Sequence, residues 1–503
     1  MWAFVSHLVA ENLPASILHE LSDHSFENYP KFKASFVQLA PQTIELLQRK
    51  YLLYTFQLNA TRIPHYACFL KKHNINPQEI TTVEEFLTKI PQTTKKNYVY
   101  TAKDMCEMCI NGDYHNISMI VKSSGHSGRQ CYWVRSHNED KFGKTALSIG
   151  LDENFQTDKK KTLIINGFIL GSWVTGINFN ELASWHCPII NVGPNKEEIF
   201  QTIIDIGHTF EQIIITGYPP FIKNLVDEGV AQKFPWKKYN VHFIGGGEDF
   251  PESWRTYVES MTKGKVRSGF GASDIGILGG MENDDTVFIR RFADTNHHFR
   301  QELFGDVEET PMLFQYPLNL FVYANEQKEL IFTTILPEAT QPVIKYNLQD
   351  EGGTLSHETM YALFKKYNIS RKIHLPSPFL YIVGRKGGAV NFNAFLIYPE
   401  NVEECIYRNP SIEKTTTGSF KFQSVFDSKH NRILCIELQL KKGIKPTEKM
   451  HKAYVTQIIT TLQQVNDGYR ISHEKFKEMA IPKVVLYEFE KYPYVDKIKN
   501  HYN

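Results

Sequence analysis

Apolar residues recur at helical spacing in the first part of the chain. One stripe, with intervals of three or four positions, consists of Ile44, Leu47, Tyr51, Tyr54 and Leu58. This spacing predicts a helix with one buried face. Thr82 and Glu85 fit a capping box that opens a short helix, and Pro91 closes it. We therefore expect residues 1–115 to form a helical N-terminal part.

From about residue 117 to 280 the pattern changes to short apolar runs that alternate with amphipathic stretches. The runs cover 117–121, 162–165, 212–215 and 240–244, and the amphipathic stretches lie near 195–207 and 219–231. Strand and helix in alternation predict a layered α/β domain. A further strand is expected over 329–334, where the chain becomes rich in strands.

Glycines at positions 384, 387 and 388 interrupt the pattern of strands and indicate a hinge. After them, alternating apolar residues predict a hairpin over 420–440, a helix from Pro446 and a last strand over 483–487. These elements predict a small α+β domain at the C-terminal end.

The length of the chain also favours more than one domain, because 503 residues exceed the size at which a single hydrophobic core stops growing. Hydrophobic residues, 42% of the total, suffice for a sizeable core. We expect an α/β fold in which a large layered N-terminal domain of mixed sheets flanked by helices covers 1–383. A small mobile α+β C-terminal domain is expected over 384–503, after the hinge.

The charge balance argues against several classes of partner. Lys and Arg number 56 against 55 Asp and Glu, which leaves neither a basic footprint for nucleic acid nor a polybasic face for a membrane. The chain has no run of about 18 apolar residues, and we expect no signal peptide. Cys106 and Cys109 form a lone CxxC that fits ordinary thiols better than a metal or redox site. We expect a cytoplasmic protein that binds a small molecule.

A segment rich in glycine and hydroxyl residues follows the predicted strand 117–121. It reads Lys-Ser-Ser-Gly-His-Ser-Gly-Arg over 122–129. Glycines let backbone N–H groups point into one concavity, hydroxyls donate to phosphate oxygens, and the terminal cation balances charge. The spacing of a Walker A loop is absent. The residues alone indicate a phosphate-binding loop, with a plain loop as the alternative.

This segment resembles the phosphate loop of the acyl-adenylate-forming superfamily, usually SSGTTGKP. Four more segments resemble family motifs in the family's order: Gly-Gly-Gly-Glu at 245–248, Ser-Gly-Phe-Gly-Ala-Ser-Asp at 268–274, the P-x-I-R-Y-x-x-x-D-like run at 342–350, and Gly-Arg at 384–385 with the YPxxIE-like run at 395–403. Ordered matches over about 280 residues are far more specific than any one of them.

The chain is most similar to the phenylacetate–CoA ligase branch of this superfamily, which also contains deazaflavin coenzyme adenylyltransferases. Two N-terminal segments carry this likeness. Residues 63–66 resemble the branch's PFYR motif, and residues 90–95, Ile-Pro-Gln-Thr-Thr-Lys, resemble its LPFTTK motif. The resemblance therefore runs from about residue 45 to near the C-terminus.

The resemblance implies a site for ATP and Mg²⁺, with coenzyme A as the acceptor. The nucleotide-binding residues would be Ser123, Ser124, Gly125, His126, Ser127, Gly128, Arg129, Gly246, Gly247, Glu248, Phe270, Gly271, Ser273 and Asp350. Within this set Phe270 would stack on the adenine and Asp350 would accept from the ribose hydroxyls. Asp274 would hold Mg²⁺ as a hard oxygen ligand. The catalytic cations would be Arg385, Lys497 and Lys499.

Each of these residues, taken alone, also has an ordinary structural interpretation. Phe270 could belong to the core, Asp350 could cap a turn, and Arg385 could lie on the surface. Lys497 and Lys499 could belong to a solvated tail. Only the joint order of the motifs favours the site.

Several positions depart from the family pattern. Arg129 stands for the usual lysine, His126 and Ser127 for two threonines, and Asp274 for glutamate. Gly387 occupies the place of a hinge residue that is often Asp, and glycine still permits a domain swing. Together these changes suggest altered activity, a different acceptor or a weakened enzyme.

The position of the acyl pocket is implied only by the resemblance. It would draw on Phe168, Trp173 and Tyr218, which suit an aromatic or apolar acid, with core packing as the alternative. The expected activity is ATP-dependent formation of an acyl-adenylate from a small carboxylic acid, followed by transfer to coenzyme A. Adenylyl transfer to a hydroxyl and a nucleotide-binding scaffold without catalysis are the alternatives. Relatives are commonly dimers, so a homodimer is expected.

Overall fold

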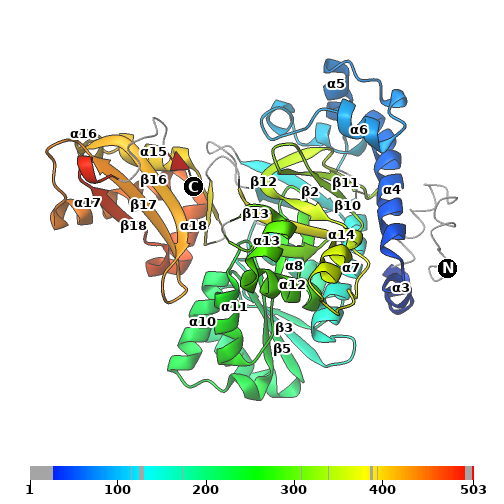
Figure 1. Ribbon diagram of the computed structural model, residues 1–503, viewed down its shortest axis with the longest axis horizontal. Coiled ribbons are helices and arrows are strands. Elements are labelled where there is room, and N and C mark those ends of the chain that lie inside the picture. The colour runs from blue at the N-terminus through cyan, green and yellow to red at the C-terminus, as the bar shows by residue number, and fades with distance from the viewer. Residues whose placement is uncertain are drawn as a thin grey trace.

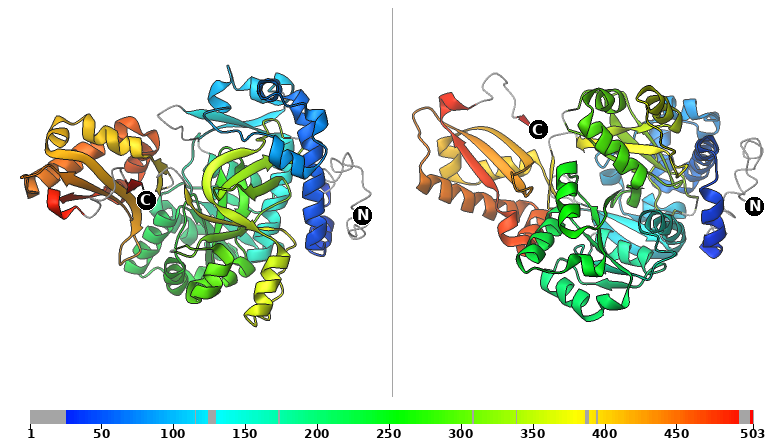
Figure 2. Two further views of the ribbon diagram at one scale, coloured as in Figure 1. Left: turned by 45° about the horizontal axis from the view of Figure 1, so that its top comes forward. Right: turned by 60° about the horizontal axis from the view of Figure 1, so that its bottom comes forward.

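The computed structural model describes residues 26–114, 116–123, 130–172, 174–307, 309–337, 339–385, 389–393 and 395–492, and the backbone of 501–502. A large body is joined to a smaller C-terminal one (Figure 1). Two further views agree that the C-terminal body lies at one end and the long helix α4 near the other (Figure 2). None of the helices in the described part is long and apolar enough to cross a bilayer.

Residues 26–114 form a helical N-terminal part. Its elements are α3 (Tyr29–Phe36), α4 (Pro41–Arg62), α5 (Pro64–Lys72), η2 (Pro77–Glu79), α6 (Val83–Lys89), η3 (Val99–Thr101), η4 (Cys106–Met108) and η5 (Ile110–Gly112). The predicted capping box at α6 is present. All seven cysteines lie among the described residues and form no disulfide, and Cys106 lies in the short turn η4.

The buried face of α4 differs from the predicted stripe in its second half. Ile44 and Leu47 are buried as expected, but Leu52 and Phe56 continue the face, while Tyr54 and Leu58 are only half-buried. The buried side chains follow intervals of three and four positions, with Gln48 included because its amide donates to the Leu320 carbonyl at 3.0 Å. The buried face of α4 therefore includes the polar Gln48 and differs from the stripe that the apolar residues alone predict.

The large domain is built on an 11-stranded mixed sheet, in the order β10-β11-β12-β13-β9-β8-β7-β6-β5-β3-β4. The strands are β3 (Thr162–Asn166), β4 (Ile189–Asn191), β5 (Gln212–Gly217), β6 (Val241–Gly246), β7 (Val266–Ala272), β8 (Gly276–Met281), β9 (Met312–Gln315), β10 (Leu320–Ala324), β11 (Glu329–Thr334), β12 (Tyr346–Leu355) and β13 (Phe379–Arg385). A separate hairpin is formed by β1 (Ile117–Ser123) and β2 (Cys131–Ser136).

Helices cover this sheet (Figure 1). They are α7 (His137–Phe155), α8 (Val174–Ala183), α9 (Lys196–Ile206), α10 (Pro219–Ala231), α11 (Glu252–Thr262), α12 (Asp284–Thr295), α13 (His297–Phe304) and α14 (His357–Lys366), with the short turns η7 (Gly207–Thr209) and η8 (Trp236–Tyr239). The isoleucine-rich strands β3 and β5 are buried along their whole length. Burial on both faces explains why these strands are continuously apolar rather than alternating.

The sheet changes from parallel to antiparallel at β7. Strand β7 runs parallel to β6 and antiparallel to β8. Because β5, β6 and β7 are parallel, their carboxyl ends meet at one edge of the sheet. The segments that follow these three strands begin at Tyr218, Gly247 and Ser273, so three predicted site segments lie along that edge.

The C-terminal domain has its own sheet and core. Its elements are β14 (Val390–Phe392), β15 (Phe395–Ile397), α15 (Pro399–Tyr407), α16 (Pro410–Thr415), β16 (Thr416–Phe426), β17 (Arg432–Leu440), α17 (Glu448–Val465), α18 (Asp467–Phe476), η9 (Lys477–Ala480), β18 (Lys483–Tyr487), η10 (Phe489–Lys491) and β19 (His501–Tyr502). The sheet order is β18-β17-β16-β19. The predicted fold class is confirmed, while a boundary at residue 384 stays a prediction.

Candidate functional site

A cavity of about 550 Å³ lies between the large domain and the C-terminal domain. The predicted site residues that line it are Ser123, Tyr218, Gly247, Glu248, Phe270, Gly271, Ser273, Asp274, Asp350 and Arg385. Of the other predicted residues, Gly246 and Phe168 lie outside this lining. Residues 124–129, Trp173, Lys497 and Lys499 are outside the described residues. The cavity thus joins segments from five separate motifs.

The strand that leads into the predicted phosphate loop is tied to the segment after β7. The Ser273 hydroxyl donates to the Lys122 carbonyl at 2.9 Å. The Arg135 guanidinium, on β2, donates to the Ser273 carbonyl. Gly271 allows the close approach of β7 and β8, since a Cβ there would lie 2.5 Å from the Ile277 Cα. The end of β1 and Asp274 therefore share one wall.

Asp274 is a buried carboxylate, with 3% of its side chain exposed. The Tyr346 hydroxyl donates to its Oδ2 at 2.7 Å, and the Lys95 Nζ lies 3.5 Å from the same atom. Burial, with Asp274 nearby, raises the pKa of Tyr346 well above its ordinary value, so Tyr346 stays a proton donor. The Asp274 carboxylate is thus held by a neutral donor and a cation.

These residues fit Mg²⁺ held jointly with a bound phosphate. The described residues contain no cluster of three or more His, Cys, Asp or Glu side chains that could hold a metal. Mg²⁺ is commonly bound by one or two carboxylates together with substrate phosphates and water. Asp274, the hard oxygen donor beside Ser123 in the cavity, matches that mode.

Asp350 and Arg385 face each other across neighbouring strands. They are register partners on β12 and β13, and Arg385 Nε lies 3.7 Å from Asp350 Oδ1. Arg385 also donates to the Leu348 carbonyl at 2.9 Å. Burial raises the pKa of Asp350, and the charge of Arg385 opposes that rise. Asp350 is therefore a strand residue in the cavity wall rather than a turn cap, and Arg385 is its partner.

The C-terminal domain contributes an arginine to the loop after β6. Arg432 Nε lies 3.0 Å from Glu248 Oε2, and both side chains are almost fully buried. Arg432 also donates to the main-chain carbonyl of Asp249 at 2.6 Å and to its Oδ1 at 2.8 Å. Burial disfavours the charge of Arg432, but Asp249 and Glu248 outweigh it and raise its pKa. Glu248 therefore binds the C-terminal domain in this structure.

Aromatic side chains form the apolar part of the site. Phe270 lies 5.9 Å from Phe314 and 6.1 Å from Phe332, measured between ring centroids, and is half-buried. Phe168 is buried and packs edge-on against Tyr218 at 5.2 Å. Tyr218 lines the cavity and Phe168 supports it from behind.

The cations Lys95 and Arg432 line the cavity but were not among the predicted site residues. Lys95 is the last residue of the LPFTTK-like segment, so that likeness could have pointed to it. The sequence around Arg432 does not indicate a role in the cavity, because its partner Asp249 is 183 positions away.

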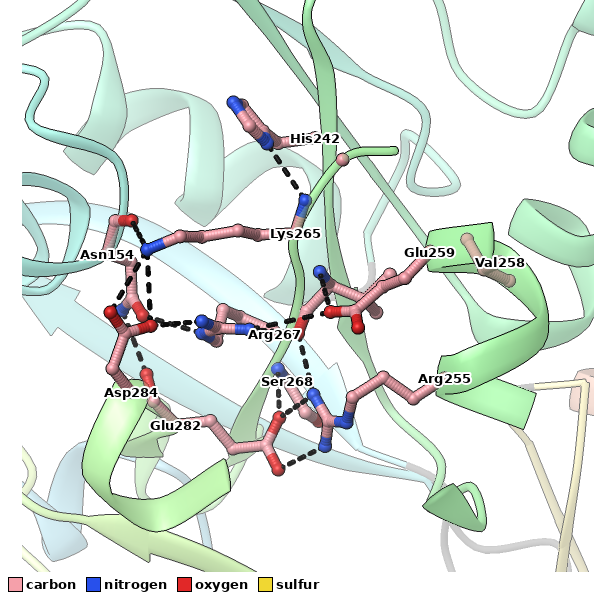
Figure 3. A network of polar contacts seen from close by, with 12 residues as sticks. Asn154, His242, Arg255, Val258, Glu259, Lys265, Arg267, Ser268, Glu282 and Asp284 are labelled. Atoms are coloured by element: carbon pink, nitrogen blue, oxygen red, sulfur yellow. Dashed lines mark hydrogen bonds and ion pairs between the residues drawn. The ribbon is translucent and has the colours of Figure 1, made fainter. Parts of the chain in front are cut away.

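A buried ion-pair network supports β7 from behind (Figure 3). Arg255 donates to Glu282 through two nitrogens, at 2.9 and 2.6 Å. The Ser268 backbone N–H donates to the same carboxylate at 2.8 Å. Arg255 Nε also lies 3.0 Å from both carboxylate oxygens of Glu252. The network fixes the start of the 268–274 segment to helix α11.

The other end of the network in Figure 3 contains a neutral histidine. His242 Nδ1 accepts from the Lys265 backbone N–H at 2.9 Å. Burial lowers the pKa of His242 to about 4, and the charges of Lys160, Lys265 and Arg267 add to this effect. Protonation of His242 would therefore remove an accepted hydrogen bond and place a cation beside three others.

The low pKa of His242 predicts a loss of stability in acid. The unfolded side chain, with a pKa of about 6.5, takes up a proton before the folded one does. The stabilisation is therefore complete above pH 6.5 and is lost as the pH falls towards 4. Between pH 7 and 4, the free energy of unfolding should fall by about 3 kcal/mol more in the wild type than in His242→Asn. Urea unfolding at a series of pH values checks this, and the exposed His208→Asn should behave like the wild type. Parallel pH profiles for His242→Asn and the wild type would contradict it.

No family model and no curated protein matches the sequence. Solved structures match by fold. A structure of 2-hydroxyisobutyryl-CoA ligase in complex with 2-HIB-AMP and CoA, in the thioesterification state, has a TM-score of 0.65 at 10% identity, over 92% of this chain and 90% of that chain. The chain has the fold of 2-hydroxyisobutyryl-CoA ligase.

Two more structures of 2-hydroxyisobutyryl-CoA ligase match at 10% identity and 92% coverage of this chain. Its open conformation with 2-HIB-AMP and CoA has a TM-score of 0.55 over 92% of that chain. Its postadenylation state with 2-HIB-AMP has a TM-score of 0.53 over 89% of that chain. The likeness to 2-hydroxyisobutyryl-CoA ligase extends over both domains, and the phenylacetate–CoA ligase branch stays a prediction.

Proposed function

We propose that this protein activates a carboxylic acid with ATP through an acyl-adenylate and then transfers the acyl group to coenzyme A. One observation carries the proposal. Ser123, Asp274 and Asp350 come from distant parts of the chain and line a single cavity, at the edge where parallel strands end. The five ordered motifs and the shared fold with 2-hydroxyisobutyryl-CoA ligase, whose structure holds 2-HIB-AMP and CoA, support it.

The proposed chemistry is attack of an acid carboxylate on the α-phosphate of ATP. A new oxygen–phosphorus bond forms as the bond to pyrophosphate breaks, so the protein must hold two anions together and stabilise phosphate oxygens. Ser123 would donate to phosphate, Ser273 would contact the α-phosphate, and Asp350 would accept from the ribose hydroxyls. Mg²⁺, when bound at Asp274, would neutralise phosphate charge. We also propose that the loop 124–129 binds the phosphates and that Lys497 and Lys499 are catalytic cations.

The wall around Tyr218 is the proposed acid subsite. Tyr218 and Val174 line the cavity beside Gly247, and Phe168 fixes the Tyr218 ring from behind. Tyr218 and the apolar wall of Val174 favour an aryl or other apolar acid. Trp173, the third residue expected here, lies outside the described residues.

Acid-dependent ATP–pyrophosphate exchange tests the proposed function. We expect at least one member of a panel of aryl and aliphatic acids to stimulate exchange, and coenzyme A then to release AMP and a thioester. An AMP-tagged product without exchange would instead indicate adenylyl transfer to a hydroxyl. ATP binding without turnover for any acid would contradict both enzymatic functions and indicate a nucleotide-binding scaffold.

The contact of Arg432 with the loop after β6 predicts a separation of the two half-reactions. This contact joins the two domains, and the TM-score is higher against the thioesterification state of 2-hydroxyisobutyryl-CoA ligase (0.65) than against its postadenylation state (0.53). Arg432→Met should therefore slow thioester formation about tenfold more than it slows exchange. ATP–pyrophosphate exchange measures the first step, and quenched time courses of AMP and thioester formation measure the second. Arg408→Met, at the exposed C-cap of α15, is the control. Equal slowing of the two steps would contradict the assigned role.

A further inference from the structure

We infer that Lys95 is a cation of the large domain that contacts the α-phosphate and the acid carboxylate during acyl-adenylate formation. This assignment rests on the proposed function. Lys95 belongs to the large domain, so the cation would be present in the cavity whatever the position of the C-terminal domain.

Lys95 lines the same cavity as Ser123, Ser273 and Asp350. Its ammonium lies 3.5 Å from Asp274 Oδ2, and only 20% of its side chain is exposed. The Lys95 charge also reaches Asp350, where it opposes the rise in the pKa of that carboxyl. The ammonium thus lies beside the acidic position proposed for the metal, in the cavity that the residue proposed for the ribose also lines.

The backbone on either side of Lys95 is anchored. Thr93 forms a bridge with the start of β12: its N–H donates to the Lys345 carbonyl and its carbonyl accepts from the Asn347 N–H, both at 2.9 Å. The Asn97 side chain accepts from the Thr94 N–H at 2.7 Å, closing a turn around Lys95. The next residue after Lys345 is Tyr346, which donates to Asp274. Lys95 and Tyr346 therefore reach Asp274 from two segments that are hydrogen-bonded to each other.

The other cations that line the described part of the cavity are Arg385 and Arg432. Arg385 is bound to the Leu348 carbonyl and faces Asp350. Arg432 is bound to the Asp249 carbonyl and carboxylate. Both guanidinium groups are thus fixed to main-chain carbonyls, whereas Lys95 carries its charge on a flexible stem that can turn from a carboxylate to a phosphate.

A lysine ammonium can serve both reacting anions at once. It has three donors, so it can bridge a phosphate oxygen and the incoming carboxylate while they approach. No bond to Lys95 forms or breaks in this step. The carboxylate oxygen forms the bond to phosphorus, the bond to pyrophosphate breaks, and pyrophosphate leaves with the electron pair.

Binding of AMP and of adenosine, without added metal, separates a phosphate contact from a structural role. Lys95→Met should weaken AMP binding about tenfold or more, because a hydrogen bond to a charged group is lost, and adenosine binding less than twofold. Lys96→Met, the exposed neighbour, should leave both within twofold. Lys95→Arg, which keeps the charge, should retain the preference for AMP. Equal effects of Lys95→Met on AMP and adenosine, or no effect on either, would overturn the assignment. Lys95→Gln serves if the Met variant does not fold.

Exchange kinetics then distinguish this inference from the proposed function. If the wild type exchanges and Lys95→Met slows it about a hundredfold, both stand. If the wild type exchanges and Lys95→Met keeps its rate, the Lys95 assignment fails and the function remains. If the wild type gives no exchange but Lys95→Met loses the AMP preference, the function fails and the phosphate contact remains. Absence of AMP binding by the wild type overturns both.

Discussion

Asp274→Asn is expected to lower acid-dependent ATP–pyrophosphate exchange at least about a hundredfold, the loss typical of one preorganised charged contact in a water-poor site. Asparagine keeps the size of the side chain and can still accept from Tyr346, so the wall of the cavity should remain. What is lost is the negative charge, which would hold the metal ion and which faces Lys95 at 3.5 Å. Initial exchange rates at saturating ATP measure the effect.

The matched control for this variant is Asp205→Asn on the exposed face of α9, which removes the same charge far from the cavity lining. It should exchange at the wild-type rate. Equal melting temperatures of the two variants would show that folding is not the cause. An Asp274→Asn protein that exchanges like the Asp205 control would remove Asp274 from the site.

Arg255→Met should lower the free energy of unfolding of the large domain by about 3–5 kcal/mol, because the buried carboxylates of Glu282 and Glu252 lose one of their two buried arginine partners, Arg290 being the other. Arg255 and Glu282 have fully buried side chains, and Glu252 is 5% exposed. Arg255 also holds Glu282 in place, and Glu282 accepts from the Ser268 N–H, so the variant should loosen the position of Ser268. Urea unfolding followed by tryptophan fluorescence measures the change.

Arg291→Met is the matched control for the buried network. Arg291 also pairs with Glu252, but 44% of its side chain is exposed. Exposed ion pairs contribute about 1 kcal/mol or less, so this variant should unfold close to the wild type. If both arginine variants lose the same small amount, the network does not stabilise β7 as argued.

Local patterns were sufficient to predict many elements. The predicted strand 483–487 has the observed bounds of β18, because a short run of β-branched and other apolar residues follows Pro482 and Lys483. Helix α10 also follows the predicted amphipathic stretch 219–231, since a proline starts it. In both cases one short segment carries the whole signal.

Contacts between distant segments could not be predicted in this way. The pairing of Arg432 with Glu248 and Asp249 depends on how two domains pack, and nothing near Arg432 in the sequence encodes it. The same is true of Lys95 and Asp274, which meet only because Thr93 pairs with the start of β12. Asp350 shows the reverse case: its register with Arg385 places it within β12 and excludes the turn cap that the sequence left open.

A crystal structure of the protein with AMP tests the central claim most directly. The account predicts one nucleotide in the cavity between the domains, with its ribose hydroxyls at Asp350 and its phosphate between Ser123, Lys95 and Asp274. A nucleotide bound elsewhere, or bound here with its phosphate turned away from Asp274, would contradict it.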